Sequence, residues 1–341
     1  MEKVTLLHVA EAAGVSVSTA SRSLTGKARQ YRIRSETERL VREAADRMGF
    51  EPSHVARSLR TQRSGLIGIV VPDISNPFFA AIAREITIAS EEHGLSVILA
   101  DSRETTSREA TLVQQLQSRQ VEGLVVCPVG ETDRHLRQLE NATESVVLVD
   151  RVFPSLSIST VTSDHESGAF RATRELIRRG HRKIACLQGR PGTLTNDERI
   201  IGYKRALAAE RIAFRTSRIA GDHFSEDSGY RASGQILDTQ PRCTAMFAFN
   251  NQIAIGALRR FAERRLSIPQ DLSLITFDDH PLAEFLASPL TVARQDAASL
   301  GKRAAKLLLS QRSSSNRRRS QTVRVPVQLI RRQSVGDIKS G

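Results

Sequence analysis

Residues Val4–Leu24, VTLLHVAEAAGVSVSTASRSL, decide how the start of this chain folds. The pattern predicts two short helices joined by a tight corner. Thr5 is the expected N-cap of the first helix, whose apolar side chains recur at 3.6-residue spacing. We expect Gly14 to end that helix, because glycine adopts a positive φ without a steric penalty. Ser16 is the expected cap of the second helix, whose outer face holds short hydrogen-bonding side chains and one arginine.

Two helices of this kind are typical of a helix-turn-helix, which presents its second helix to the major groove of DNA. An ordinary helical hairpin with a polar outer face is the alternative. Ser35-Glu36-Thr37-Glu38 has the pattern of a capping box and predicts a third helix that ends at Gly49. The basic loop 26–34 before it is interpreted either as a phosphate contact or as a solvated loop.

The net charge of +13 over 341 residues favours a polyanionic partner such as nucleic acid. The chain starts without a long apolar run, and no later run is long enough to span a bilayer. We therefore expect a cytoplasmic protein with no membrane partner.

The sequence gives no positive support for an enzyme, a metal site or a cofactor. Cys127, Cys186 and Cys243 are too far apart for metal-ligand spacing. Asp278-Asp279-His280 has no second ligand set, and neither a phosphate-binding loop nor a nucleophile elbow is present.

Ser53–Gly65, SHVARSLRTQRSG, follows the helix-breaking Pro52 and predicts a short helix with Val55 and Leu59 on one face. So short a helix is unstable alone, because nucleation is costly. In a dimer, two copies could pair through Val55 and place Leu59 as a wedge in the minor groove. A plain linker is the alternative.

From Leu66 onward, apolar strand-like runs alternate with helical ones, which indicates parallel sheets covered on both faces. There are too many such units for one sheet, so two α/β lobes are expected. The runs are 66–71, 95–100, 122–127, 145–149, 183–187, 244–249 and 272–277, and VRVPVQLI (323–330) is the expected last strand. We expect residues 311–322 to form a disordered surface loop, with nucleic-acid binding as the alternative.

Asn76, Asp150, Asn250 and Asp278 all fall where an expected strand ends. Ligands of such folds bind beyond the carboxyl ends of parallel strands. Each residue alone is equally explained as a turn residue or a helix cap. The coincidence of four favours a cleft between the lobes for a small polyol-like molecule.

The order of these motifs resembles the lactose/galactose/purine repressor family of bacterial transcription regulators over nearly the whole chain. VTLLHVAEAAGVSVSTASRSL and GFEPSHVARSLRTQRSGLIGIVVPDISNPFF (49–79) are specific together. Later motifs such as VVLVDR (146–151), RGHRKIACLQG (179–189) and AFNNQIAIGAL (248–258) are shared with periplasmic sugar-binding proteins.

This resemblance implies an α/β fold with an N-terminal three-helix helix-turn-helix head (1–52) and a hinge helix with linker (53–64). A two-lobed, periplasmic-binding-protein-like core of parallel sheets would follow (65–335). Lobe 1 is expected at about 65–162 and 293–322, and lobe 2 at about 163–292 and 323–335.

The resemblance also implies two sets of site residues. The expected DNA contacts are Thr5, Ser16, Val17, Ser18, Thr19, Ser21, Arg22, Val55, Ala56 and Leu59. The expected effector contacts are Asn76, Phe78, Phe79, Asp150, Arg151, Arg199, Phe224, Asn250, Asp278 and Gln295. Such a set suits a sugar, because arginines and carboxylates bind vicinal hydroxyls while aromatic rings cover the apolar ring face.

The implied protein is a homodimeric repressor that binds near-palindromic double-stranded DNA under the control of a sugar-like effector. No C-terminal heptad zipper is evident, so a dimer is expected rather than a zipper tetramer. If the chain were a solute-binding protein, we would expect an export signal and no DNA-binding head. If it were a sugar-processing enzyme, we would expect a catalytic motif.

Four residues and one loop depart from the family pattern. Thr25 stands where asparagine is usual before Gly26, and the loop after Gly26 is a few residues longer than usual. Val17 is apolar, which favours contact with a thymine methyl group. His8 stands where an acidic residue is common, and we expect it to weaken the cap of the first helix. Asn251 replaces the aspartate that usually follows Asn250, and we expect it to loosen the polar network of the second lobe.

Overall fold

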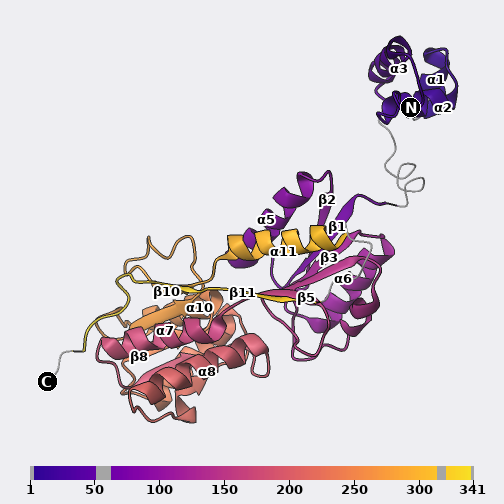
Figure 1. The fold of residues 1–341 in the computed structure, drawn as a ribbon. Coiled ribbons are helices and arrows are strands. Elements are labelled where there is room, and N and C mark those ends of the chain that lie inside the picture. The colour runs from indigo at the N-terminus through magenta and orange to yellow at the C-terminus, as the bar shows by residue number, and fades with distance from the viewer. Residues whose placement is uncertain (1–3, 51–62, 313–319, 339–341) are drawn as a thin grey trace. The chain divides into compact units, whose positions relative to one another are not determined.

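The computed structural model describes residues 4–50, 63–312 and 320–338, which fall into two compact units divided after Ser64. The described residues of the first unit form three helices, α1 (Leu6–Ala12), α2 (Val17–Leu24) and α3 (Ser35–Met48). The second unit contains two six-stranded sheets with helices on their faces (Figure 1).

The helix-turn-helix predicted at the start of the chain is present. Thr5 is the N-cap of α1, and the Thr19 amide donates to Ser16 Oγ at 3.1 Å to cap α2. Gly14 has a φ of 64° at the corner, as expected. The Thr5 amide donates to His8 Nδ1 at 3.4 Å, so the imidazole supplies the acceptor that a carboxylate would otherwise provide.

The capping box predicted on Ser35 is wrong. Arg34 is the N-cap of α3 and makes no side-chain cap, while Ser35 is already the first helical residue. Glu38 instead pairs with Arg42 one turn later, at 2.7 Å. The spacing of Ser35 and Glu38 alone cannot show whether the helix begins at Ser35 or one residue later, because helix ends are uncertain by one or two residues. Gly49 ends the helix with a φ of 62°, as predicted.

The cap of α2 gives the first testable expectation. Ser16→Ala removes the acceptor of the Thr19 amide and should destabilise the head by about 1 kcal/mol. Hydrogen exchange of the α2 amides in the full chain measures this loss as faster local opening. Ser18→Ala on the exposed face of α2 is the matched control, and an equal effect there would contradict a specific role for the cap.

Lobe 1 is built on a parallel sheet with the strand order β11-β5-β4-β3-β1-β2. Helices α5 (Pro77–Glu91) and α11 (Ala297–Arg312) pack together against one face, and α6 (Thr106–Ser118) packs against the other (Figure 1). The apolar face of α5 is buried at Phe79, Ile82 and Ile86. The strands are β1 (Leu66–Val71), β2 (Ser96–Asp101), β3 (Gly123–Val126), β4 (Ser145–Val149), β5 (Ser159–Ser163) and β11 (Thr322–Val325), and a short 3-10 helix spans Arg137–Asn141.

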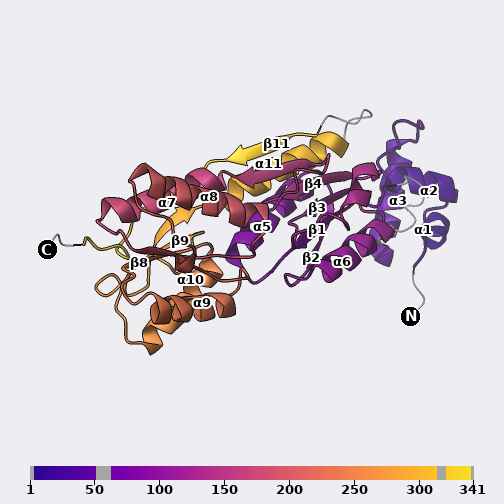
Figure 2. The ribbon, with the colours of Figure 1, turned by 90° about the horizontal axis from the view of Figure 1, so that it is seen from below.

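Lobe 2 is built on a sheet with the order β12-β10-β9-β8-β6-β7, in which only β12 runs antiparallel to its neighbour. Helices α7 (His165–Arg178) and α8 (Leu194–Ala209) cover one face, and α9 (Glu226–Thr239) and α10 (Asn251–Glu263) cover the other (Figure 2). The strands are β6 (Ile184–Leu187), β7 (Ile219–Ala220), β8 (Ala245–Ala248), β9 (Ser273–Phe277), β10 (Thr291–Arg294) and β12 (Gln328–Ile330), with a 3-10 turn at Thr216–Arg218.

The single last strand predicted at 323–330 is wrong. The segment forms two strands in different sheets, β11 beside β5 in lobe 1 and β12 beside β10 in lobe 2. Pro326 lies between them and lacks the N–H that a continuous ladder needs. The second chain segment of lobe 1, predicted at about 293–322, therefore begins after β10 and includes all of β11. Of the expected surface loop, Gln311 and Arg312 belong to α11, and 313–319 lie outside the described residues.

Candidate functional site

The four polar residues predicted at strand ends lie at the cleft between the lobes. Asn76 caps α5 by accepting from the Phe78 amide at 3.1 Å, and Asn250 caps α10 by accepting from the Ile253 amide at 2.8 Å. Asp150 directly follows β4 and Asp278 directly follows β9, with φ values of 67° and 66°. Two of the four residues therefore cap helices, and all four converge on one cleft.

One small cavity is lined by all ten predicted effector residues and by Thr195. The lining residues are Asn76, Phe78, Phe79, Asp150, Arg151, Thr195, Arg199, Phe224, Asn250, Asp278 and Gln295. Its volume is about 20 Å³, enough for about one water molecule. The lobes are therefore closed on one another, and a sugar requires them to move apart.

Two contacts hold the lobes together across this cavity. The amides of Asn76 and Asn251 are paired reciprocally, with nitrogen–oxygen distances of 3.0 and 3.4 Å. The guanidinium of Arg151 lies 4.8 Å from the ring centre of Phe224. Asn251, which we expected to loosen the polar network of lobe 2, instead bonds across the cleft to lobe 1.

Arg199 is the most deeply buried cation of the site. Its guanidinium donates to the carbonyl of Phe249, lies 3.2 Å from His165 Nδ1 and is 3.9 Å from the ring centre of Phe277. Burial, reinforced by Arg199, holds the pKa of His165 well below its ordinary value. A neutral imidazole can accept a hydrogen bond from the guanidinium, and this contact fixes the arginine in the cavity wall.

The two carboxylates of the site are destabilised as anions. Burial raises the pKa of Asp150 from 3.8 to about 6, although Arg199 and Arg151 oppose the shift. Burial also raises the pKa of Asp278, against the opposing effects of Arg199 and a 2.6 Å hydrogen bond from Gln295. Two guanidinium groups therefore face two carboxyl groups, which makes the lining close to neutral.

Four buried polar atoms of the lining have no hydrogen-bond partner within residues 4–50, 63–312 and 320–338. They are Asp150 Oδ1, Thr195 Oγ1, Arg199 Nε and Gln295 Oε1. Leaving such atoms unpaired costs roughly 1–3 kcal/mol each. Donors and acceptors gathered in this way fit a ligand that carries several hydroxyl groups.

Besides His165, the sequence did not predict Thr195 and Glu104 as residues of this site. Thr195 lies in the first turn of α8 and lines the cavity. Glu104 holds Arg151 by two hydrogen bonds of 2.7 and 2.6 Å, and this attraction outweighs burial and raises the pKa of Arg151. Neither residue stands in a recognisable sequence motif, and Glu104 is 47 positions away from its partner Arg151. In the structure, Glu104 has an unusual positive φ of 52°.

The head presents the predicted DNA-contact residues on and around α2. Thr5 and Ser16 act as caps, while Val17, Ser18 and Arg22 are exposed, and Thr19 and Ser21 are half-buried. The guanidinium of Arg22 lies 4.0 Å from the ring centre of Tyr31, which belongs to the basic loop 26–34. Val55, Ala56 and Leu59 lie outside the described residues.

The described part of the chain contains no group of three or more His, Cys, Asp or Glu residues placed to hold a metal ion. Asp279 instead forms a two-pronged pair with Arg332 at 2.8–2.9 Å. None of its helices combines the length and the apolar character needed to cross a bilayer.

Comparisons with known proteins agree with this architecture. The family model described as bacterial regulatory proteins, lacI family, matches residues 5–53, and that of a periplasmic binding protein-like domain matches residues 173–335. Catabolite control protein A of Priestia megaterium is 31% identical over 306 residues, which cover 89% of this chain and 91% of that protein.

Two solved structures extend the comparison. The lac repressor dimer bound to operator and the anti-inducer ONPF matches with a TM-score of 0.85 and 27% identity, covering 98% of this chain and all of that one. A LacI family transcriptional regulator from Enterococcus faecium with bound ribose matches with a TM-score of 0.72 and 27% identity, covering 80% of this chain and all of that one.

Proposed function

Because the chain belongs to the lacI family of bacterial regulatory proteins, we propose that it is a homodimeric transcription repressor controlled by a small sugar-like effector. The head would bind operator DNA in the cytoplasm, and the effector would bind between the lobes of the core. Phosphate contacts would supply much of the DNA affinity and make it strongly dependent on salt. The wedge assigned to Leu59 remains part of this proposal.

The observation that carries the effector site is the set of four unpaired polar atoms in the cavity lining, next to the rings of Phe78, Phe79 and Phe224. A sugar would pair those atoms through its hydroxyl groups and present its apolar ring face to an aromatic ring. The balance of two arginines against two aspartates favours a neutral sugar over a sugar phosphate, since no surplus cation is available for a phosphate group.

The decisive experiment is a thermal-shift screen of the purified full chain against neutral pentoses, hexoses and disaccharides, with their phosphates in parallel. A ligand at 100 times its Kd stabilises the folded state by about 2.7 kcal/mol, which shifts Tm by roughly 5–10 °C for a core of this size. A response to phosphates alone, or to no sugar at all, would contradict the proposed effector class.

The DNA-binding part is tested separately at Arg22, which is exposed on α2. Arg22→Ala should lower affinity for the selected operator about tenfold, because a base-contacting arginine contributes roughly 1–3 kcal/mol. Fluorescence anisotropy at fixed salt measures the change. Arg39→Ala on α3 is the matched control, since Arg39 pairs with Glu43 at the surface, and an equal loss there would contradict a base contact by Arg22.

A further inference from the structure

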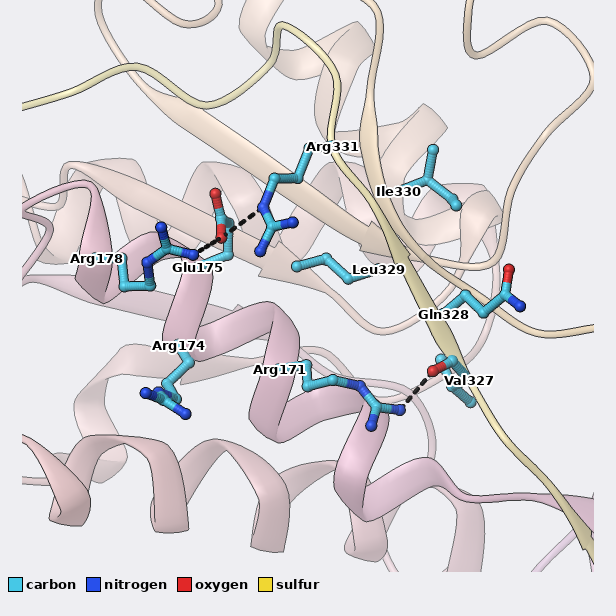
Figure 3. A pocket seen from close by; sticks show the side chains of 9 residues that line it. All are labelled: Arg171, Arg174, Glu175, Arg178, Val327, Gln328, Leu329, Ile330 and Arg331. Atoms are coloured by element: carbon cyan, nitrogen blue, oxygen red, sulfur yellow. Dashed lines mark hydrogen bonds and ion pairs between the residues drawn. The ribbon is translucent and has the colours of Figure 1, made fainter.

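Helix α7 and strand β12 border an open groove of about 690 Å³ on lobe 2 (Figure 3). The groove and the effector cavity have no lining residue in common. Two contacts connect the helix to the strand. Arg171 donates to the carbonyl of Val327, and Glu175 pairs with Arg331 at 2.9 Å. These two contacts join the sides of the groove at two points.

The groove carries a surplus of positive charge. Arg171, Arg174 and Arg178 are exposed and recur at i, i+3 and i+7, so they lie along one side of α7. Arg331 lies opposite, directly after β12. Among the described residues, Glu175 is the single carboxylate of the lining, and it is already paired with Arg178 at 3.3 Å and with Arg331. Four guanidinium groups therefore face one carboxylate.

The backbone of β12 offers hydrogen-bonding groups to the same groove. β12 is one of the two edge strands of the sheet formed by the described residues. The Ala293 carbonyl accepts a hydrogen bond from the backbone amide of Asp278, the residue that directly follows β9. The N–H and C=O groups of Ala293 therefore face β9 and not β12. Its antiparallel partner Leu329 therefore directs its own N–H and C=O away from β10. Val327, two residues earlier, faces the same way and accepts from Arg171.

The floor of the groove is apolar. Val327 is buried, and Leu329 shares its side of the strand, because side chains alternate along a β-strand. Leu329 is half-buried, so part of its side chain remains available to a ligand. The groove therefore combines an apolar floor, an open strand edge and a row of cations.

We propose that this groove binds an extended acidic segment of a partner protein, which pairs with β12 as an additional strand. From Arg171 to Arg178 the helix rises about 10 Å, the length of about three residues of a strand. Acidic side chains at alternate positions, about 7 Å apart, would reach successive arginines while the backbone pairs with Leu329. This partner would bind independently of DNA and of the effector.

The test uses the full chain and a fluorescein-labelled heptapeptide in which glutamate alternates with valine. Fluorescence anisotropy should show saturable binding that weakens as salt increases. The same peptide with lysine in place of glutamate should not bind. Arg174→Glu should weaken binding at least tenfold, since Arg174 contacts the ring of Phe170 and has no carboxylate partner within the described residues. Arg242→Glu, the same charge change on an exposed turn of lobe 2, is the matched control.

Backbone pairing is tested at Leu329. Leu329→Pro removes the outward N–H at an edge position that tolerates proline, and it should weaken peptide binding at least tenfold while leaving Tm unchanged. In the wild-type chain, saturating peptide should slow hydrogen exchange of the Leu329 amide, which supports the proposal even if the proline variant misfolds. Binding of the lysine peptide, an equal loss in Arg242→Glu, or unprotected Leu329 exchange would overturn the proposal. Full displacement by tripolyphosphate with unprotected exchange would identify a small-anion site instead.

Discussion

Arg199→Met is expected to lower affinity for the effector at least 100-fold, the largest single effect in the cleft. The substitution removes a donor that is aimed at the cavity and leaves Asp150 and Asp278 buried without their main cation. A hydrogen bond to a charged group is worth about 1.5–3 kcal/mol. Losing one member of a buried charge set costs about 3–5 kcal/mol. Calorimetric titration with the sugar identified by the thermal-shift screen measures the loss.

Two further variants separate ligand binding from folding. Arg199→Lys keeps the positive charge but not the planar fork, so we expect it to recover part of the affinity and most of the stability. Arg205→Met lies on the same helix, where Arg205 pairs with Glu166 at the surface, and it should leave affinity unchanged. If Arg199→Met binds the sugar as tightly as the wild type, Arg199 does not contact the effector.

Much of the fold could be predicted because its signals are local. The strands β1 and β4 match the predicted runs at both ends, since each is a continuous apolar segment between polar residues. The cleft residues could be placed because the ends of parallel strands meet at one edge of a sheet. Asp150 and Asp278 directly follow two such ends.

What the sequence did not reveal depends on contacts between distant segments. β5, Ser159–Ser163, has no apolar run, yet every one of its residues is buried. Its side chains find partners elsewhere, as Thr162 donates to the Asp150 carbonyl at 2.6 Å and Ser159 accepts from Gln311 at 2.8 Å. The assignment of β11 and β12 to different lobes is also a property of tertiary packing, because both halves of VRVPVQLI have the same alternation.

The second large effect expected in the cleft is a dependence of effector affinity on pH. Burial raises the pKa of Asp150 to about 6, above its ordinary 3.8. The folded state therefore holds this proton more tightly than the unfolded state does. The associated stability, at most about 3 kcal/mol, is fully present below pH 3.8 and is lost as the pH rises through 6. Asp278, whose pKa is also raised, contributes in the same direction.

Effector binding should lower the pKa of Asp150 again, because sugar hydroxyls that donate to Asp150 Oδ1 stabilise the carboxylate. If binding returns the pKa to about 4, affinity should rise about tenfold between pH 5 and pH 7. Asp150→Asn should abolish most of this rise and lower affinity at pH 7 about 30-fold. Asp222→Asn, an exposed carboxylate of lobe 2, should keep the wild-type profile. A rise that persists unchanged in Asp150→Asn would assign the titration to Asp278 and contradict a hydrogen bond from the sugar to Asp150.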